Sequence, residues 1–250
     1  MKRINGNLQF EKTPRIVSFA SAVGKKEGEG PLGNYFDRVI HDSYVGKDTF
    51  EQAESELLST AVRIALNKGD FESGDIDIAC CGDLLNQCVA SSFAMRPYGI
   101  PYAGVYGACS TMALAMIVAA MAVENGAAER AVCAASSHYC TAERQYRFPL
   151  EYGSQRPPTA QWTVTGSGAC VLDKADTKAI PEQQYPLIYA ARIGRICDYH
   201  ITDQNNMGAA MAPAVVKLGT KICSHTYWCI ENAVLSSGLT QIVRTAQKAS

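Results

Sequence analysis

The chain has 250 residues, of which 47% are apolar and 19% are charged, and its formal net charge is −1. This length can bury a sizeable core, as one domain or two small ones. The charge balance gives no reason to expect nucleic acid, which usually meets a basic surface. The start of the chain lacks the apolar segment of a signal peptide, and the longest apolar run, 113–123, is shorter than the ~20 residues of a membrane span. We therefore expect a protein that is soluble, or at most peripheral to a membrane.

Continuously apolar strands alternate with helices between residues 14 and 173. The expected strands cover 14–23, 75–82, 102–108, 129–138 and 162–172. The expected helices cover 47–69, 83–97 and 109–127, and long loops cover 24–36 and 140–161. This alternation predicts an α/β fold with a mostly parallel sheet that helices cover on both faces.

The first long helix has a start signal, a stop signal and an apolar face. Asp48 followed by Glu51 forms a capping-box-like start, and Gly69 ends the helix. Apolar residues recur through it at helical spacing. They are Ala53, Leu57, Leu58, Ala61 and Ile64. The helix at 109–127 differs because it is apolar nearly all round, which predicts that it is buried.

A second unit begins after the first and does not finish. The stretch 186–202 contains a further strand, and 207–219 begins a helix. The sequence from about residue 216 has weak periodicity and a burst of Cys, His, Tyr and Trp. We therefore expect a first half at 1–180 and a partial second half at 181–250, with an atypical tail.

The spacing of the ten cysteines indicates neither a metal site nor a disulfide framework. None belongs to a C-x-x-C pair, and nothing in the chain indicates secretion, so neither zinc nor disulfides are expected. Most are expected to be small core residues. Cys80 and Cys81 would point to opposite faces of their strand.

Cys109 lies on a small-residue turn, "VYGACST" at 105–111, between a strand and the first turn of a helix. We call this segment the elbow. Helix starts expose N–H groups and partial positive charge, which lower a thiol pKa and attract carboxylates. The elbow therefore suits a nucleophilic thiolate, an anion-binding pocket and a packed structural cysteine, and physical chemistry alone leaves all three open.

Other polar residues follow expected strands, where ligands gather in parallel sheets. Each also has a structural reading: a helix cap for Asp83, a hydrogen-bonded histidine for His138, and a solvated loop for the charged residues near 144. The candidate binding residues are Asp83, Asn86, His138, Glu143, Arg144 and Asp198. The glycines at 166 and 168 are not a dinucleotide fingerprint, since a third glycine and a following helix are missing, and no cofactor is expected.

Several long motifs in the same order make the chain resemble the stage V sporulation protein AD family of spore-forming bacteria. The resemblance runs from about residue 8 to about residue 215. The motifs are "EGPLGNYFD", "CGDLLNQ", "GACST", "SSHYCTAERQYRFPLEYG", "RPPTAQWTVTGSGA" and "ITDQNNMGAAMAPA". The resemblance implies a thiolase-like fold of two related α/β halves in a five-layer sandwich.

The resemblance also implies binding of dipicolinic acid, alone or with calcium, and help with its uptake into the developing spore. It implies membrane partners from the same operon, a location at the spore inner membrane, and a homodimer. Cys109 falls where thiolases hold their acyl-accepting cysteine, but the histidines, 41, 138, 200 and 225, do not supply an evident base. Cys109 is therefore better explained as a pocket residue. The alternatives are an acyltransferase that uses Cys109, and a truncated or frameshifted product without function.

Overall fold

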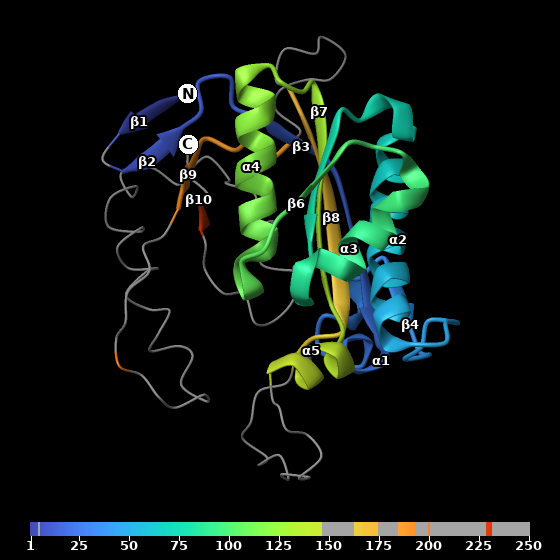
Figure 1. The fold of residues 1–250 in the computed structure, drawn as a ribbon. Helices are drawn as coiled ribbons and strands as arrows, with labels where there is room; N and C mark the ends of the chain where they lie inside the picture. The colour runs from blue at the N-terminus through green and yellow to red at the C-terminus, as the bar shows by residue number, and fades with distance from the viewer. Residues whose placement is uncertain (5, 147–162, 175–184, 194–199, 201–228, 232–250) are drawn as a thin grey trace.

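A computed structural model describes residues 1–4, 6–146, 163–174, 185–193, 200 and 229–231 (Figure 1). Its main body is a six-stranded sheet. In spatial order the strands are β4 (Arg38–Ile40), β3 (Arg15–Gly24), β8 (Gly166–Asp173), β7 (Arg130–Ser137), β5 (Ile78–Gly82) and β6 (Tyr102–Gly104). The helices are α1 (Lys25–Gly28), α2 (Phe50–Gly69), α3 (Val89–Met95), α4 (Thr111–Asn125) and α5 (Tyr139–Tyr146).

The sheet is mixed, with parallel pairing in the majority. β5 is parallel to β6 and β7, and β3 is parallel to β4. β8 is antiparallel to both of its neighbours, β3 and β7. The expected α/β class with a mostly parallel sheet is therefore confirmed.

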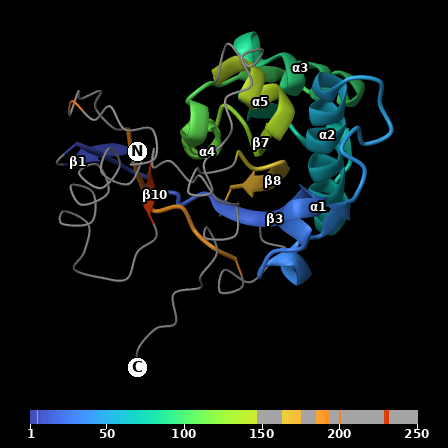
Figure 2. The ribbon, with the colours of Figure 1, turned by 90° about the horizontal axis from the view of Figure 1, so that it is seen from below.

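Helices cover both faces of this sheet, as Figure 2 shows for α2 and α4. Strand side chains alternate between the two apolar clusters that result, because successive residues of a strand point to opposite faces. Cys81 and Val132 pack with α2 and α3, whereas Cys80 and Cys133 pack with α4. The expected division of Cys80 and Cys81 between the two faces is confirmed.

The N-cap of the long helix α2 lies one residue later than expected. Its N-cap is Thr49, whose hydroxyl accepts a hydrogen bond from the Gln52 N–H at 3.3 Å. The Gln52 side chain in turn accepts from the Asp48 N–H at 3.3 Å. The expected box with Asp48 and Glu51 was wrong, because Thr49 is the cap and Gln52, not Glu51, bonds at the helix start, with the Thr49 side chain and the Asp48 backbone. The helix ends at Gly69 as expected, and Asp70 takes the left-handed position after it.

Two other expected boundaries are wrong. The expected helix from residue 83 begins as α3 only at Val89, because Gln87 (φ 64°) and Cys88 (φ 53°) are left-handed and interrupt helical winding. The expected loop from residue 140 instead starts with α5. The glycine-rich loop at 24–36 also contains short helical turns, α1 and the 3₁₀ turn Gly33–Tyr35.

A second sheet joins the start of the chain to later residues. Its order is β1 (Lys2–Ile4), β2 (Asn7–Gln9), β9 (Ala190–Arg192) and β10 (Cys229–Glu231). β9 falls within the strand expected at 186–202, whereas the helix expected at 207–219 and most of the tail lie outside the described residues. The expected division near residue 180 stays a prediction, although β2, which pairs with β1, also pairs with β9 beyond that residue.

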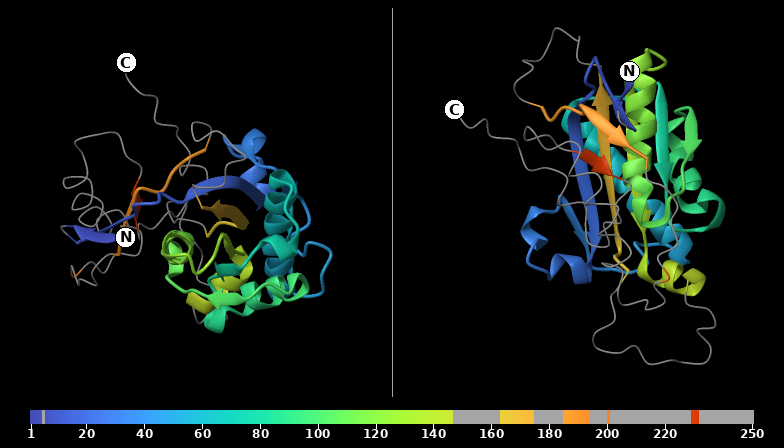
Figure 3. Two further views of the ribbon diagram at one scale, coloured as in Figure 1. Left: turned by 90° about the horizontal axis from the view of Figure 1, so that it is seen from above. Right: turned by 90° about the vertical axis from the view of Figure 1, so that its left-hand side faces the viewer.

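Helix α4 lies between the two sheets (Figure 1, Figure 3). The window Ala108–Asn125 is long and apolar enough to cross a membrane by composition, with a mean hydropathy of 1.5, and half of it is buried. In the fold it packs on β5 and β7 with Ala115, Met116 and Ala119 fully or almost fully buried. The expectation of a buried core helix is therefore confirmed.

Candidate functional site

Three strand ends bring the main sequence-predicted residues to one edge of the six-stranded sheet. β5 lies between β6 and β7 and is parallel to both, so all three strands end at the same edge. Asp83 follows β5, His138 follows β7, and Cys109 lies in the elbow that follows β6. We call this edge, the lower one in Figure 1, the site edge. Ligands of open α/β sheets gather at edges of this kind.

The backbone of the elbow packs closely against the end of β5, and one residue of the elbow is strained. Ala108 has φ 48°, a left-handed conformation that is uncommon for a residue with a side chain. The Thr111 hydroxyl donates to the Ala108 carbonyl at 2.7 Å and accepts from the Gly107 N–H at 3.2 Å. A Cβ on Gly82 would lie 2.0 Å from the Val105 carbonyl oxygen. The glycine at the end of β5 therefore allows the elbow to approach it.

Cys109 is exposed at this elbow, but its thiol is not activated. The surroundings of the sulfur withdraw it in part from water, and this desolvation raises the pKa of the Cys109 thiol above its ordinary value. Its own backbone N–H lowers the pKa by a smaller amount. At neutral pH the sulfur is a thiol, and only the thiolate is a strong nucleophile. The geometry favours a residue that borders a pocket over a nucleophile.

The start of α4 has neither a side-chain cap nor an acidic residue. Its N-cap, Ser110, makes no side-chain capping bond, and the first turn contains no acidic residue. The first N–H groups of a helix have no partners within the helix and carry partial positive charge. In the elbow, however, the N–H groups of Gly107, Ser110 and Thr111 already have acceptors within the elbow. What the start of α4 offers a carboxylate near Cys109 is therefore the positive end of the helix dipole.

Asp83, in contrast, is committed to the fold. It is fully buried, its Oδ1 accepts from the Leu85 N–H at 2.8 Å, and its Oδ2 accepts from the Ser91 N–H at 2.6 Å. Ser91 belongs to the first turn of α3, so Asp83 caps that helix across the intervening loop. This is the structural reading of Asp83, with the helix start displaced to Val89.

Both ring nitrogens of His138 are hydrogen-bonded to backbone groups. Its Nδ1 accepts from the Cys140 N–H at 3.2 Å, so Nε2 carries the hydrogen and donates to the Ser43 carbonyl at 2.8 Å. The ring stacks on Phe50 of α2 with centroids 5.1 Å apart. His138 is 1% exposed. It is therefore a neutral histidine that anchors the start of α5.

The four remaining candidates are placed differently from one another. Asn86 is exposed, on the loop that follows Asp83. Glu143 is buried and accepts from the Thr163 hydroxyl at 3.1 Å. The backbone of Arg144 lies in α5 at the site edge, and Asp198 lies outside the described residues.

Sequence reasoning missed Glu54, a buried acid beneath the site edge. Its Oε1 accepts from the Ser136 hydroxyl at 3.2 Å and its Oε2 lies 2.6 Å from the Thr141 hydroxyl. Burial raises the pKa of Glu54 to about 7, and the nearby Asp83 charge adds to the shift, although the two hydroxyl bonds oppose it. The signal was present in the sequence, because residue 54 precedes Leu57 and Leu58 by three and four positions on the apolar face of α2.

Seven cysteines of the described residues are free. Cys80, Cys81, Cys133 and Cys170 are buried, Cys88 and Cys140 are half-buried, and Cys109 alone among the seven is exposed. Within the part of the chain that the structure describes, no group of three His, Cys, Asp or Glu side chains could hold a metal ion.

Comparison with known proteins identifies the family. The family model for stage V sporulation protein AD matches residues 5–227. Stage V sporulation protein AD of Bacillus subtilis is 42% identical over 205 residues, which are 82% of this chain and 59% of that protein. The chain thus spans about three fifths of the length of this relative, and the family match continues past residue 215, where the resemblance was expected to stop.

Solved structures of condensing enzymes are similar over about two thirds of the chain. 3-Oxoacyl-(acyl carrier protein) synthase III from Xanthomonas oryzae is 17% identical, with a TM-score of 0.46 over 69% of this chain and 59% of that chain. OleA from Xanthomonas campestris is 13% identical, with a TM-score of 0.48 over 69% and 60%. Both are condensing enzymes, and condensing enzymes have the thiolase-like fold that the resemblance implies. A similarity of this degree carries no statement about the activity of this chain.

Proposed function

Because this chain belongs to the stage V sporulation protein AD family, we propose that it binds dipicolinic acid at the site edge and assists the uptake of this acid into the developing spore. The observation that carries the proposal is the start of α4, where the positive end of a helix without a side-chain cap lies beside the exposed Cys109. Nothing in this role requires bond formation, since the protein would bind and hand on the acid.

The chemistry of dipicolinic acid suits such an edge. It is a flat pyridine with two carboxylates, so its recognition requires N–H or guanidinium donors and a wall for the ring. The positive end of α4 would attract one carboxylate, and Asn86 and Arg144 are the candidate donors to the other. Cys109 would border the ring. Asp83, His138 and Glu143 would support the site from inside, because their polar atoms bond to the protein.

The wider role involves partners. We expect membrane proteins encoded in the same operon to receive the acid, which would place this protein at the periphery of the spore inner membrane. A homodimer is the expected assembly. Vesicles that contain those partners would test the transfer, because uptake of dipicolinic acid should depend on this protein.

Acyl transfer through Cys109 is the second candidate, favoured by the exposure of the thiol on a strained elbow. It needs a base, and both ring nitrogens of His138 are bound to backbone groups. Incubation with acyl-CoA followed by intact-mass measurement separates the two functions. An acyl adduct on Cys109 would support transfer, whereas its absence together with saturable dipicolinate binding would support the uptake role.

Calorimetric titration tests the binding proposal. We expect saturable binding of dipicolinate and at least about tenfold weaker binding of picolinate, which has one carboxylate, because a lost charge-assisted bond costs ~1.5–3 kcal/mol. Cys109→Ala should weaken binding, whereas Cys170→Ala, which removes a buried thiol from β8, should not. Equal affinity of the Cys109→Ala variant and the unmodified protein would remove Cys109 from the site. Titration with and without calcium distinguishes the free acid from its calcium complex.

A further inference from the structure

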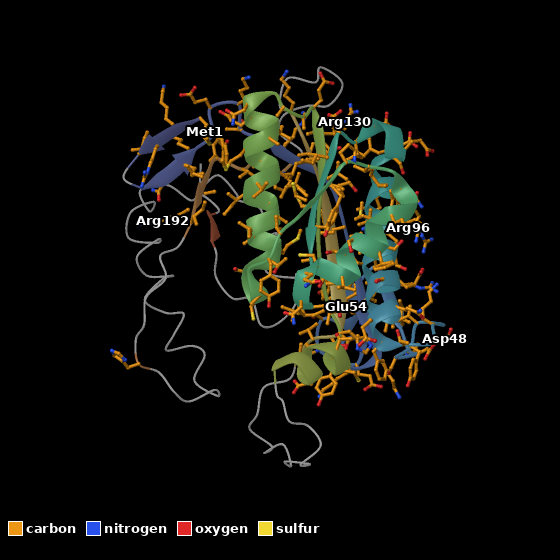
Figure 4. All side chains as sticks on the ribbon, in the orientation of Figure 1. Met1, Asp48, Glu54, Arg96, Arg130 and Arg192 are labelled. Carbon is orange, nitrogen blue, oxygen red and sulfur yellow. The ribbon has the colours of Figure 1, made fainter. Side chains whose placement is uncertain are left out.

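One buried carboxyl joins three segments of the site edge. Glu54 is fully buried on the inner side of α2, near the end of the sheet where α5 lies (Figure 4). Its oxygens contact the hydroxyls of Ser136, at the end of β7, and Thr141, in the first turn of α5. The backbone N–H of Leu84, just after β5, is its third partner.

A count of hydrogens shows which form of Glu54 this arrangement fits. The Thr141 hydroxyl lies 2.6 Å from Glu54 Oε2 and 2.9 Å from the His138 carbonyl oxygen. It has a single hydrogen, and the carbonyl can only accept. If Glu54 is ionised, this hydrogen cannot satisfy both neighbours, and one short oxygen–oxygen contact has no hydrogen in it. If Glu54 carries a proton on Oε2, the acid donates to Thr141, and Thr141 donates to His138.

The charges around Glu54 also oppose ionisation. Asp83, from the end of β5, is the like charge that faces it. The ring of His138, which lies on Phe50 one turn earlier in α2, is neutral, and Cys81 of β5 is a buried thiol. β3, β8 and α3 turn apolar side chains toward this face of α2. Among the side chains that the structure describes, which do not include that of Arg144 in α5, no group in this shell offers a compensating positive charge.

We propose that Glu54 is a positioning residue that keeps its proton in the folded protein and, as a neutral acid, holds the ends of β5 and β7 and the start of α5 together beneath the site edge. Loss of the proton breaks the chain of bonds from Glu54 through Thr141 to His138, and loosens the segments that carry Asp83, His138 and Glu143. This proposal does not depend on the identity of the ligand.

The sign of the pH dependence follows. The folded-state pKa of Glu54, about 7, lies above its ordinary value of 4.5, so the folded protein binds the proton more tightly than the unfolded chain does. The stability that the proton on Glu54 contributes is fully present below about pH 4.5 and is lost as the pH rises to about 7. Above that pH this group no longer changes the free energy of unfolding as the pH rises further.

Glu54→Gln is the direct test, because an amide mimics the neutral acid: its N–H can donate to Thr141 and its oxygen can accept from Ser136. We expect the unfolding midpoint of the unmodified protein to fall by about 5 °C or more between about pH 5 and pH 8 through this group. Glu54→Gln should lack this component and be the more stable protein at the higher pH. Glu56→Gln, on the same helix at a half-exposed ion pair with Lys47, should follow the unmodified protein. An unchanged pH slope in Glu54→Gln would overturn the proposal.

Infrared spectroscopy supplies a test that does not need the glutamine variant to fold. The unmodified protein should show the carbonyl band of a protonated carboxylic acid that disappears as the pH is raised through about 7. Thr141→Val should shift the frequency of this band, because the acid loses its acceptor, whereas Thr141→Ser should leave it in place. Absence of the band near pH 6 would overturn the proposal. If the band and the pH slope are present and dipicolinate does not bind, the proposed function fails and this inference stands.

Discussion

At the scale of single residues, the side chains at the site edge are of two kinds. Some can contact a ligand, and others already use their polar atoms in hydrogen bonds within the fold. Cys109 is exposed, and desolvation raises the pKa of its thiol more than the bond from its own N–H lowers it. Asp83 and His138 look as promising in the sequence, yet each uses both of its polar atoms on backbone groups. Residue type and spacing predict where such groups lie, and the local bonds decide whether they are free to meet a ligand.

The state of the Cys109 thiol can be measured by alkylation. Its pKa lies above the ordinary value, so less than about 1% is thiolate at neutral pH. We expect iodoacetamide to label Cys109 slowly at pH 7 and the rate to rise about tenfold per pH unit until the pH passes 9. Cys133 is fully buried and should stay unlabelled in the folded protein, which makes it the internal control. A rate that reaches its plateau near pH 7 would instead indicate an activated thiolate.

At the scale of elements, the strands were predictable and the segments between them were less so. The expected strand at 129–138 and β7 differ by a single residue at each end, because an uninterrupted run of small and β-branched residues has few alternatives. The expected start of the helix at residue 83 failed, since Asp83 caps α3 from a distance and the chain between them is left-handed at Gln87 and Cys88. No local pattern encodes a cap that acts across a loop.

The candidate site was predictable in outline for the same reason. The ends of parallel strands meet at one edge whatever their loops do, so Asp83, Cys109 and His138 could be placed together from the sequence. Glu54 could not be assigned a role, because its partners Ser136 and Thr141 are more than eighty residues away and meet it only after the sheet has formed. Its place on an apolar helix face was the signal to follow.

The junction between β5 and the elbow is the element-scale feature that a substitution can test. A Cβ at Gly82 would lie 2.0 Å from the Val105 carbonyl oxygen and 2.4 Å from Thr111 Cγ2. The first of these is backbone and cannot move alone, so we expect Gly82→Ala to lower the free energy of unfolding by about 3 kcal/mol. Dipicolinate binding should weaken as well, since the start of α4 would be displaced.

Gly74→Ala is the matched control, because a Cβ there would have no neighbour within 4 Å. Chemical denaturation of both variants should give a clear loss for residue 82 and a change near zero for residue 74. Equal stabilities would mean that the elbow can withdraw from β5 without cost, and the close packing would then not position Cys109.

At the scale of the whole molecule, α4 is the element that the two sheets share. One apolar cluster contains Met116 and Ile117 of α4, strand residues of the six-stranded sheet, and Phe10, Ile188 and Ala191 from the side of the second sheet. Phe10 also donates its backbone N–H to the Tyr189 carbonyl at 2.8 Å. The elbow with Cys109, at one end of α4, therefore precedes a helix whose other contacts depend on the second sheet.

Phe10→Ala tests this dependence. Phe10 is 2% exposed, and removal of a buried phenylalanine side chain leaves a cavity that costs about 3–5 kcal/mol. Phe93→Ala makes the same change on α3, where the ring is 61% exposed, and should cost less than about 0.5 kcal/mol. If Phe10 couples the sheets, amide exchange in α4 should accelerate in Phe10→Ala along with exchange in β9, because both pack against the lost ring. Acceleration confined to β1 and β2, with α4 unchanged, would show that the six-stranded body and its site edge hold α4 without help from the second sheet.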